Sequence, residues 1–389
     1  MHGFGLKGYV VGYGSIDALG NNPWSSYQKS LDNVDYKTWF EDLGFMGYTV
    51  KDRDILYPDG WKPKNNSRAQ KFFMHATNLA LAHSRLPIVP NVAVILSSTL
   101  SEGELNDENF PKRAEGKRIP LRSLVNTITD MCTYHVCNHW GFHGLSSSVA
   151  AACATGLVGI DYAMRILHKY DYVIVGGADA GIYKTTMEGF DSIGALSSDN
   201  RPFDDNRSGF VMGEGAGVMI LQSKHSVDKF NSTVHAALYE PGHATEGLSL
   251  TSPAEDGRGA MQAMQQALKN APVSVVDTVC CHATSTPIGD ITEYQAIEKT
   301  FSHNPILWAP KSKLGHTVAA SGILETIHLL EAFRAKRIPH IQNLENCSFD
   351  TRRLLNYKNT NISSNQKWAL NNSFGFGGKN MSQVIELLN

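Results

Sequence analysis

The sequence has few cysteines and almost no excess of either charge, and each shortage excludes a class of protein. Six cysteines in 389 residues are too few for a disulfide scaffold and fit a reducing compartment, so we expect a cytoplasmic protein. The formal net charge of −2 gives no general attraction to nucleic acid or to an anionic membrane surface. Residues 1–7 lack a basic segment followed by an apolar run, so no signal peptide is expected.

One segment, from Cys132 to Ile160, contains no Asp, Glu, Lys or Arg. A membrane helix needs about 20 mostly apolar residues. This segment is long enough, but His135, Asn138, His139 and three serines interrupt it. We therefore predict no membrane span but a buried pair of helices around a strand. Such a surface is too apolar to face water, which predicts a dimer that covers it.

The rest of the composition is typical of an α/β protein. The 42% hydrophobic content, the 19% charged content and the 34 glycines indicate a compact protein with many tight turns. Apolar runs alternate with amphipathic segments in two halves of similar layout, which suggests a duplication into residues 1–228 and 229–389. The expected elements are strands at 8–14, 91–98, 172–178, 213–221 and 275–281, helices after Cys153 and at 290–301 and 318–335, and a flexible turn at 371–378 before a final strand.

Cys153 lies in a run of small residues, 146–156, that leads into a helical pattern. Leu157, Ile160 and Met164 recur at three- and four-residue spacing, so the helix after the cysteine has one apolar face. Unpaired backbone N–H groups and the helix dipole at its start favour the thiolate form of Cys153. The small neighbours leave room for a substrate, which makes Cys153 a candidate nucleophile. A buried structural cysteine is the alternative.

Two histidines stand on loops at the ends of expected elements. His282 follows a strand and opens the segment 282–290, which contains small hydroxyl residues, a proline and a glycine. His316 precedes the helix expected from residue 318. Neutral imidazole N–H groups can stabilise a thioester carbonyl as it becomes enolate-like. A thiol with two such imidazoles fits decarboxylation and carbon–carbon bond formation better than it fits hydrolysis.

Five blocks of sequence resemble the β-ketoacyl–acyl carrier protein synthases of the KAS I/II type, which are condensing enzymes of the thiolase superfamily. The resemblance spans residues 10–385. It implies a thiolase-like layered α/β/α/β/α fold of two duplicated halves with mixed five-stranded sheets. Ala151 and Ala283 depart from the family's pattern, where threonine and glycine are common. The matching blocks are Ala151-Ala152-Cys153-Ala154, Arg201-Pro202-Phe203-Asp204 with Gly209 through Gly217, His282 through Asp290, Lys311 through His316, and Asn372 through Gly378.

The resemblance also implies a role for each matched position. Cys153 would accept an acyl group as a thioester, and His282 and His316 would support decarboxylation of a malonyl unit. Lys311 would fix the network around His316, and Glu325 would brace it. The other implied residues are the backbone amides of Cys153 and Phe376 as the oxyanion hole, Phe376 also as a gate, Thr284 and Thr286 at the phosphopantetheine arm, and Leu100 and Phe190 in the acyl pocket.

The implied partner is an acyl carrier protein, whose acidic surface would dock on basic residues near the tunnel mouth. No metal or cofactor is implied, because the phosphopantetheine arrives on the carrier. The chain would act as a homodimer, or as the active half of a heterodimer with a chain-length factor that lacks the nucleophile. Fatty-acid and polyketide or polyene pathways both stay open, with a modest preference for the latter. The candidate docking clusters are Lys64, Arg68 and Lys71, and Lys112, Arg113, Lys117 and Arg118.

Two further alternatives are a metal site and a thiolase. A thiolase shares the fold but has a second reactive cysteine near its C-terminus, and residues 372–378 contain none. The possible zinc ligands lie at helical spacing and lack a C-x-x-C pair, which favours a buried helix at a subunit interface. Those residues are Cys132, His135, Cys137, His139 and His143.

Overall fold

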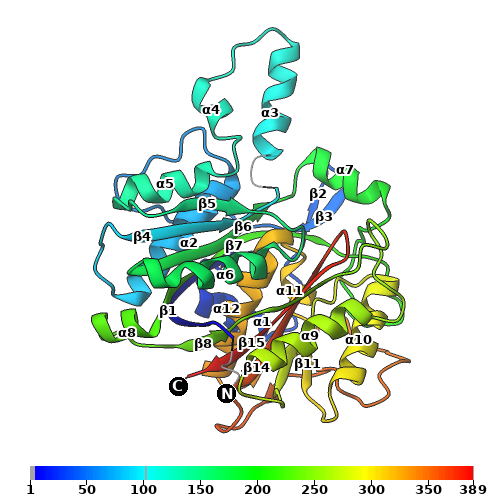
Figure 1. The fold of residues 1–389 in the computed structure, drawn as a ribbon. Helices are drawn as coiled ribbons and strands as arrows, with labels where there is room; N and C mark the ends of the chain where they lie inside the picture. Colours follow the sequence, from blue (N-terminus) through cyan, green and yellow to red (C-terminus); the bar gives the residue numbers. More distant parts are fainter. Residues whose placement is uncertain (1–4, 101–102, 389) are drawn as a thin grey trace.

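The strands of both halves join into one continuous mixed sheet. The computed structural model describes residues 5–100 and 103–388 (Figure 1). Its strands run in the order β11-β10-β14-β15-β8-β1-β7-β6-β4-β5. The first half contributes β1 (Lys7–Asp17), β4 (Val92–Ser97), β5 (Ser146–Val149), β6 (Tyr172–Ala180) and β7 (Met212–Gln222). The second half contributes β8 (Ala236–Tyr239), β10 (Thr278–Cys280), β11 (Ile306–Trp308), β14 (Trp368–Gly375) and β15 (Lys379–Leu387).

The two halves have the same strand topology. In the first, β5, β4 and β6 are parallel, and β6, β7 and β1 alternate in direction. In the second, β11, β10 and β14 are parallel, and β14, β15 and β8 alternate. Antiparallel pairing of β1 with β8 joins them. The two mixed five-stranded sheets expected from the sequence are therefore confirmed, as two parts of one sheet. The division at residue 228 stays a prediction.

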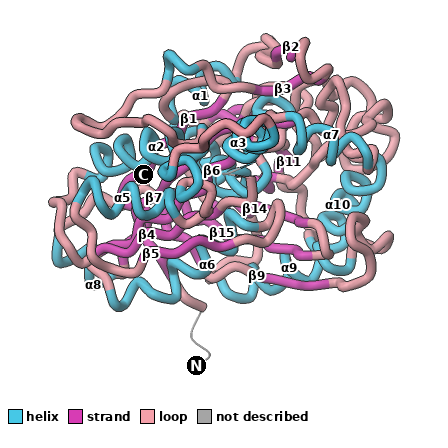
Figure 2. Tube along the Cα trace, turned by 90° about the horizontal axis from the view of Figure 1, so that it is seen from above, coloured by secondary structure: helices cyan, strands magenta, loops and turns pink. Residues whose placement is uncertain are grey.

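Helices cover both sheet regions and separate them, which gives the five layers α/β/α/β/α. Helices α2 (Arg68–Ser84) and α5 (Met131–Trp140) pack on the outer face of the first region. Helices α6 (Thr155–Ile166) and α12 (Ser321–Arg334) lie between the two regions and contact strands of both. Helix α9 (Arg258–Asn270) covers the second region by packing on β14 and β15, and α10 (Pro287–Thr300) packs against α9. Figure 2 shows the strands from above, with helices and loops around them.

The remaining elements lie at the edges of these layers. Helices α3 and α4 project from the body at the top of Figure 1. The bounds are α1 (Pro23–Ser30), β2 (Thr38–Phe40), β3 (Phe45–Tyr48), η1 (Asp52–Asp54), α3 (Gly103–Ala114), α4 (Leu121–Val125), η2 (Leu167–Lys169), α7 (Lys184–Ser192), α8 (Lys224–Phe230), β9 (Gly242–Thr245), α11 (Lys311–Leu314), η3 (Val318–Ala320), β12 (Arg337–Ile338) and β13 (Thr360–Asn361).

Local sequence explains the central packing. The apolar run of β4 is buried along its whole length, as expected for a strand covered on both faces. Leu157, Ile160 and Met164 of α6 are buried, so the apolar face expected after Cys153 is confirmed. A Cβ at Gly156 would lie 3.0 Å from the backbone nitrogen of Ile323, so glycine permits α6 and α12 to touch.

Several element boundaries differ from expectation. The segment 371–378 was expected to be a flexible turn, but residues 371–375 belong to β14 because they pair with β15. The helix expected at 318–335 begins only at Ser321, after a 3₁₀ turn. The helix expected from residue 290 begins at Pro287, since proline is favourable in a first helical turn. Among the described residues, no helix is both long enough and apolar enough to span a membrane.

Candidate active site

Cys153 lies in a tight turn between the edge strand β5 and helix α6. The preceding residue, Ala152, has a φ of 50°, a left-handed conformation that costs roughly 1–2 kcal/mol for a residue with a Cβ. Thr155 fixes this turn, because its Oγ1 accepts from the amide of Ala151 at 2.7 Å and donates to the carbonyl of Ala152 at 2.5 Å. The turn places Cys153, which is only 6% exposed, in the wall of a cavity.

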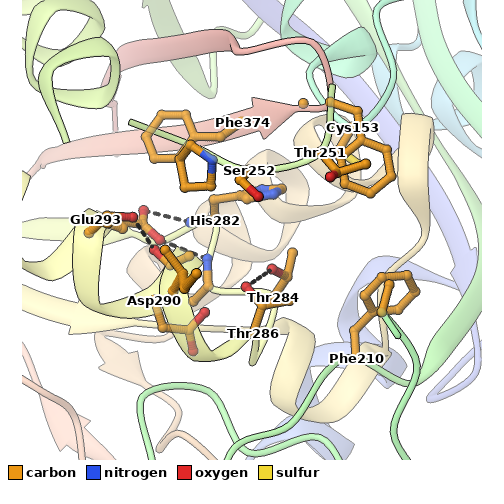
Figure 3. A pocket seen from close by; sticks show the side chains of 18 of the residues that line it. Cys153, Phe210, Thr251, Ser252, His282, Thr284, Thr286, Asp290, Glu293 and Phe374 are labelled. Carbon is orange, nitrogen blue, oxygen red and sulfur yellow. Dashed lines mark hydrogen bonds between the residues drawn. The ribbon is translucent and has the colours of Figure 1, made fainter. Parts of the chain in front are cut away.

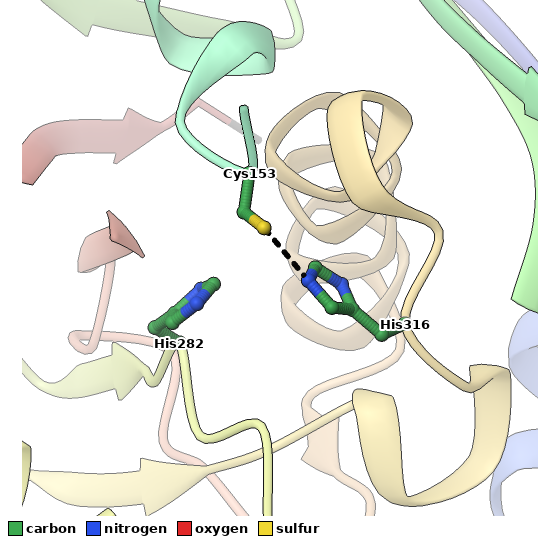
Figure 4. A group of neighbouring side chains, drawn as sticks. All are labelled: Cys153, His282 and His316. Carbon is green, nitrogen blue, oxygen red and sulfur yellow. Dashed lines mark hydrogen bonds between the residues drawn. The ribbon is translucent and has the colours of Figure 1, made fainter. Parts of the chain in front are cut away.

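His316 and His282 converge on the thiol. His316 occupies the equivalent turn of the second half, before α12, and its Nε2 lies 3.0 Å from Cys153 Sγ (Figure 4). His282 follows β10, and its ring centroid lies 5.6 Å from that of His316. The sulfur and one nitrogen of each ring all lie within 4.8 Å of one another. The structure thus brings together the three residues that the sequence singled out, although Cys153 and His316 are 163 positions apart.

A buried carboxylate holds the loop that carries His282. Glu293 in α10 is 2% exposed and accepts from the amides of His282 and Ala283, each at 2.8 Å (Figure 3). Asn372 donates to the same carboxylate at 3.0 Å. These bonds fix the backbone at His282 from two different elements, so the direction of its imidazole depends on them.

A strained backbone residue lies within two positions of each of Cys153, His282 and His316. Ala283 follows His282 with a φ of 33°, and Val318 lies two positions after His316 with a φ of 47°. Together with Ala152, these non-glycine residues adopt left-handed conformations that cost of order 1–3 kcal/mol each and gather at functional sites. The surrounding packing must stabilise them.

The Cys153 thiol is protonated at neutral pH. Burial raises its pKa to about 12, although the charge of Lys311 acts in the opposite direction. The thiolate expected from the position at a helix start is therefore wrong for the resting protein, because removal from water outweighs the helix end. A base must take the proton before the sulfur can attack, and His316 Nε2 is within hydrogen-bond distance of it.

Both imidazoles are neutral. Burial lowers the pKa of His316 well below its ordinary value, and the charge of Lys311 lowers it further. Burial, Lys311 and His316 lower the pKa of His282 in the same way. A neutral ring can accept a proton at one nitrogen or donate a hydrogen bond from it, whereas an imidazolium can only donate.

Lys311 acts on this site through its charge. Its Nζ lies 2.5 Å from Oε1 of Glu325, and each side chain is 1% exposed. Burial lowers the pKa of Lys311, but the Glu325 carboxylate outweighs this effect and the net shift is upward. Burial raises the pKa of Glu325 to about 7 against the opposing charge of Lys311. Lys311 and Glu325 thus form an ion pair, and the ammonium has no direct hydrogen bond to His316 among the described contacts. Their roles in fixing and bracing the network around His316 stay predictions.

Replacing Lys311 by methionine should lower the free energy of unfolding by about 3 kcal/mol, because Glu325 then remains buried without a cation. Urea unfolding of Lys311→Met and of Lys311→Met/Glu325→Leu measures this. The double variant should regain most of the loss, since an apolar pair of similar volume has no buried charge. A double variant as unstable as the single one would contradict the interpretation.

A cavity of about 270 Å³ leads from the surface to Cys153, His282 and His316. Thr284 and Thr286 line it, with their hydroxyl oxygens 3.3 Å apart (Figure 3). Two hydroxyls on a narrow passage can bind the amides of an extended polar arm.

Three aromatic rings line part of the cavity. Phe190 lies 5.4 Å from Phe210 and 6.3 Å from Phe376 between ring centroids, and all three line the cavity. Phe190 therefore lies where an acyl chain could enter. Leu100 packs in the same apolar cluster as Cys153 but is not among the described residues that line this cavity, so its place in an acyl pocket stays a prediction.

The Gly375–Phe376 backbone lies beside the nucleophile. A Cβ on Gly375 would come within 2.8 Å of the carbonyl oxygen of Ala151 and 3.2 Å of the amide nitrogen of Cys153. Only glycine permits this approach, which brings the next residue, Phe376, close to the Cys153 amide. The oxyanion hole formed by these two amides stays a prediction.

The basic cluster expected to dock a carrier includes one residue with another function. The Arg68 guanidinium pairs with the buried Glu214, which is 2% exposed, and also with Asp52. Arg68 is thus engaged in ion pairs within the protein, and its docking role stays a prediction. Lys64 is exposed and Lys71 is half-buried, whereas Lys112, Arg113, Lys117 and Arg118 are exposed on or next to the projecting helix α3.

Sequence reasoning missed three residues that organise the site: Glu293, Thr155 and Asp179. Asp179 is fully buried and accepts from the amides of Thr99, Leu100 and Ala319, which ties the loop after β4 to the turn after His316. The sequence feature that could have identified Asp179 is a carboxylate near the end of an apolar strand, because a buried charge requires hydrogen-bond partners.

The Cys132–His143 cluster does not gather as metal ligands. Within the described residues, the one group of three or more His, Cys, Asp or Glu side chains close enough to hold an ion is Cys153, His282 and His316. Metal-bound histidines usually donate their second N–H to a carboxylate or carbonyl. Here Nδ1 of His316 contacts a hydroxyl, and Nδ1 of His282 has no hydrogen-bond partner among residues 5–100 and 103–388, so this set fits a metal poorly.

Comparison with known proteins agrees with this geometry. The family models "Beta-ketoacyl synthase, N-terminal domain" and "Beta-ketoacyl synthase, C-terminal domain" match residues 59–226 and 235–345. The chain is 30% identical to the chloroplastic 3-oxoacyl-[acyl-carrier-protein] synthase II of Arabidopsis thaliana, over 97% of this chain and 75% of that protein. It is 28% identical to 3-oxoacyl-[acyl-carrier-protein] synthase 2 of Staphylococcus aureus, over 97% of this chain and all of that protein.

Solved structures share the fold. The ishigamide ketosynthase/chain length factor matches with a TM-score of 0.88 at 23% identity, over 99% of this chain and 100% of that one. A beta-ketoacyl synthase from Burkholderia phymatum matches with a TM-score of 0.83 at 24% identity, over 99% and 100%. Two family models in chain order, full-length relatives and the duplicated fold lead to one conclusion: this chain belongs to the beta-ketoacyl synthase family of condensing enzymes.

Proposed function

We propose that this protein catalyses decarboxylative condensation of an acyl thioester with a malonyl thioester, both carried on an acyl carrier protein, to give a 3-oxoacyl product. The observation that carries the proposal is the contact of a protonated, buried thiol with one neutral imidazole, beside a second neutral imidazole. Such a set can load an acyl group and then stabilise an enolate without a metal or another cofactor.

In the first step, Cys153 Sγ attacks the carbonyl carbon of the incoming acyl thioester. The thiol proton moves to Nε2 of His316 and from there to the sulfur of the departing carrier arm. A new carbon–sulfur bond to Cys153 replaces the bond to the carrier, so the ring of His316 returns to neutral. The amides of Cys153 and Phe376 would receive the developing negative oxygen.

In the second step, a malonyl thioester enters the same passage and its carboxylate leaves as carbon dioxide. Nε2–H groups of His282 and His316 would donate to the thioester oxygen as it becomes an enolate. The carbanion attacks the acyl carbon on Cys153 and forms the new carbon–carbon bond. The Cys153 thiolate departs and takes up one proton from solvent that enters the cavity, which restores the resting thiol.

The carrier's phosphopantetheine arm would lie along the cavity and contact Thr284 and Thr286. Support comes from their place in its wall between the surface and the thiol. Phe376, on a turn with glycines on both sides, would move aside when an acyl chain enters beside Phe190.

A polyketide or polyene pathway is our preferred setting for this reaction. One matched structure is a type II PKS acyl-carrier protein in complex with its ketosynthase, with a TM-score of 0.88. Two others pair a ketosynthase with a chain length factor. The curated relatives named above are 3-oxoacyl-[acyl-carrier-protein] synthases, so fatty-acid synthesis is the alternative.

A specific feature favours a partner subunit. Helices α3, α4 and the following turn expose apolar side chains: Phe110 at 64%, Leu121 at 76%, Leu124 at 62% and Ile128 at 54%. Strand β5 is the edge of the sheet, and its residues are only half-buried. Such a surface would be covered by a second copy or by a chain-length factor. Light scattering of the purified chain, alone and after co-expression with a nucleophile-lacking relative, decides between the two.

Incubation with acyl-carrier and malonyl-carrier substrates of varied chain length tests the reaction itself. Mass spectrometry should show an acyl adduct on Cys153, then a carrier-bound product longer by two carbons with a 3-oxo group. The set of accepted chains identifies the pathway. Hydrolysis of the acyl group without elongation would contradict the proposal.

A further inference from the structure

Two buried hydroxyls stand behind His316, on the side away from the thiol. Oγ of Ser321 lies 3.1 Å from Nδ1 of His316, and Oγ1 of Thr317 lies 3.0 Å from Oγ of Ser321. Ser321 and Thr317 are each 2% exposed, so water does not compete for these bonds. Because Nε2 contacts Cys153 Sγ at 3.0 Å, the four groups form one chain of hydrogen bonds from Thr317 to the sulfur.

The proposed reaction, on which this inference rests, needs His316 in opposite tautomers. During loading, Nε2 must be unprotonated to accept the thiol proton, and Nδ1 then carries hydrogen. During decarboxylation, Nε2 must carry hydrogen to donate to the enolate oxygen, and Nδ1 is then an acceptor. Burial and Lys311 keep this ring neutral, so one nitrogen is protonated and the other is not.

The chemical nature of the Nδ1 partner decides which tautomer is stable. A backbone N–H group can only donate and would stabilise the tautomer with hydrogen on Nε2. A carbonyl or carboxylate can only accept and would lock the other form. A hydroxyl can do both by rotating about its C–O bond. Thr317 completes the arrangement, because it can donate to Ser321 when Ser321 donates to His316, and accept from Ser321 when the direction reverses.

We propose that Ser321 is a positioning residue that supports both neutral tautomers of His316 and so permits one histidine to serve as base in loading and as hydrogen-bond donor in decarboxylation. Between the two half-reactions, Nε2 takes up one proton from solvent in the cavity. Nδ1 gives its own proton to Ser321, and Ser321 passes one to Thr317, which releases one to solvent, so the ring keeps the same number of protons and the hydroxyls end in the reversed direction. His282 differs, since its Nδ1 has no hydrogen-bond partner within the part of the chain that the structure describes. The two histidines are therefore not equivalent in what they can do.

The two half-reactions are measured separately in the full-length protein. Acyl transfer to Cys153 is followed by intact mass, and carbon dioxide release from malonyl-carrier is followed without an acyl donor. Ser321→Ala should slow each about tenfold, which corresponds to the loss of one buried hydrogen bond of about 1.4 kcal/mol. Ser321→Thr should restore both rates to within about threefold, because it returns the hydroxyl.

Thr326→Ala is the matched control. Thr326 is a buried hydroxyl residue on the same helix. It bonds to the carbonyl of Gly322 and to Asn371, and among the described contacts it has no hydrogen bond to His316. Its half-reaction rates should equal those of the unsubstituted protein. If Thr326→Ala slows both steps as much as Ser321→Ala does, the effect is general packing and the inference is overturned.

Nitrogen NMR of protein labelled with ¹⁵N-histidine reports the tautomer of the His316 ring. If Ser321 had only a structural role, its substitution would leave these ring nitrogen shifts unchanged. The ring nitrogen shifts of His316, assigned by their loss in His316→Ala, should change between the unsubstituted protein and Ser321→Ala. Unchanged shifts, or rates within twofold of normal in Ser321→Ala, overturn the inference and leave the proposed function intact. An unsubstituted protein that neither loads nor decarboxylates overturns the proposed function itself. The NMR comparison uses only the unsubstituted protein and Ser321→Ala, so it tests the inference even if Ser321→Thr folds poorly.

Discussion

Cys153→Ala should lose acyl loading entirely while it continues to release carbon dioxide from malonyl-carrier. The sulfur forms the bond that holds the acyl group, and the Cβ of alanine has no nucleophilic atom to replace it. Loss of the nucleophile should lower condensation by at least about 10⁴-fold, the order found when such a group is removed from a cooperating set. His282 and His316 remain in place, and their N–H groups are the ones that stabilise the enolate.

Intact mass after incubation with acyl-carrier, together with carbon dioxide release from malonyl-carrier, measures the two effects. Cys347→Ala is the matched control, since Cys347 is a half-buried thiol outside the cavity lining. It should load and condense normally. Full condensing activity in Cys153→Ala would refute the assignment of the nucleophile.

Loss of either histidine should damage decarboxylation more than loading. Removing one preorganised donor to a developing oxyanion costs about 10²–10³-fold in rate. His282→Ala should show this loss in carbon dioxide release and load at nearly the normal rate, because Sγ of Cys153 has its hydrogen bond to the other ring. His316→Ala should also load more slowly than His282→Ala, since burial raises the pKa of Cys153 to about 12 and the thiol requires a base.

The pH profile gives a second check on the same residues. The pKa of His282 and that of His316 are both lowered from an ordinary value of 6.5. As the pH falls through 6.5, an ordinary imidazole would gain a proton, whereas these two remain neutral until their lower pKa values are reached. Decarboxylation should therefore not fall at pH 6.5. The exposed His243 offers a control substitution, and a decline centred near 6.5 would contradict the neutral-imidazole mechanism.

The sequence predicted much of the site because its chemistry is carried by short, ordered motifs. The motifs predict Cys153, His282, His316, Lys311 and Glu325, and the structure brings the thiol to the two imidazoles and pairs Lys311 with Glu325. The thiolate was wrong because the protonation state depends on burial, which a helix start does not reveal. The ion pair of Arg68 with Glu214 could not be predicted for a similar reason, since the two residues are 146 positions apart.

The sequence alone determined which reactive groups the chain has, the order of its motifs, and hence its family. The tertiary structure decided what those groups can do. The fold places the turn after β5, which carries Cys153, beside the turn after α11, which carries His316, and so brings the thiol within 3.0 Å of an imidazole nitrogen. Burial away from water then raises the pKa of the Cys153 thiol, which stays protonated, and lowers the pKa of both imidazoles, which stay neutral. The contact of the Ser321 hydroxyl with His316 could be found only in the tertiary structure, because it depends on how the 3₁₀ turn before α12 folds back.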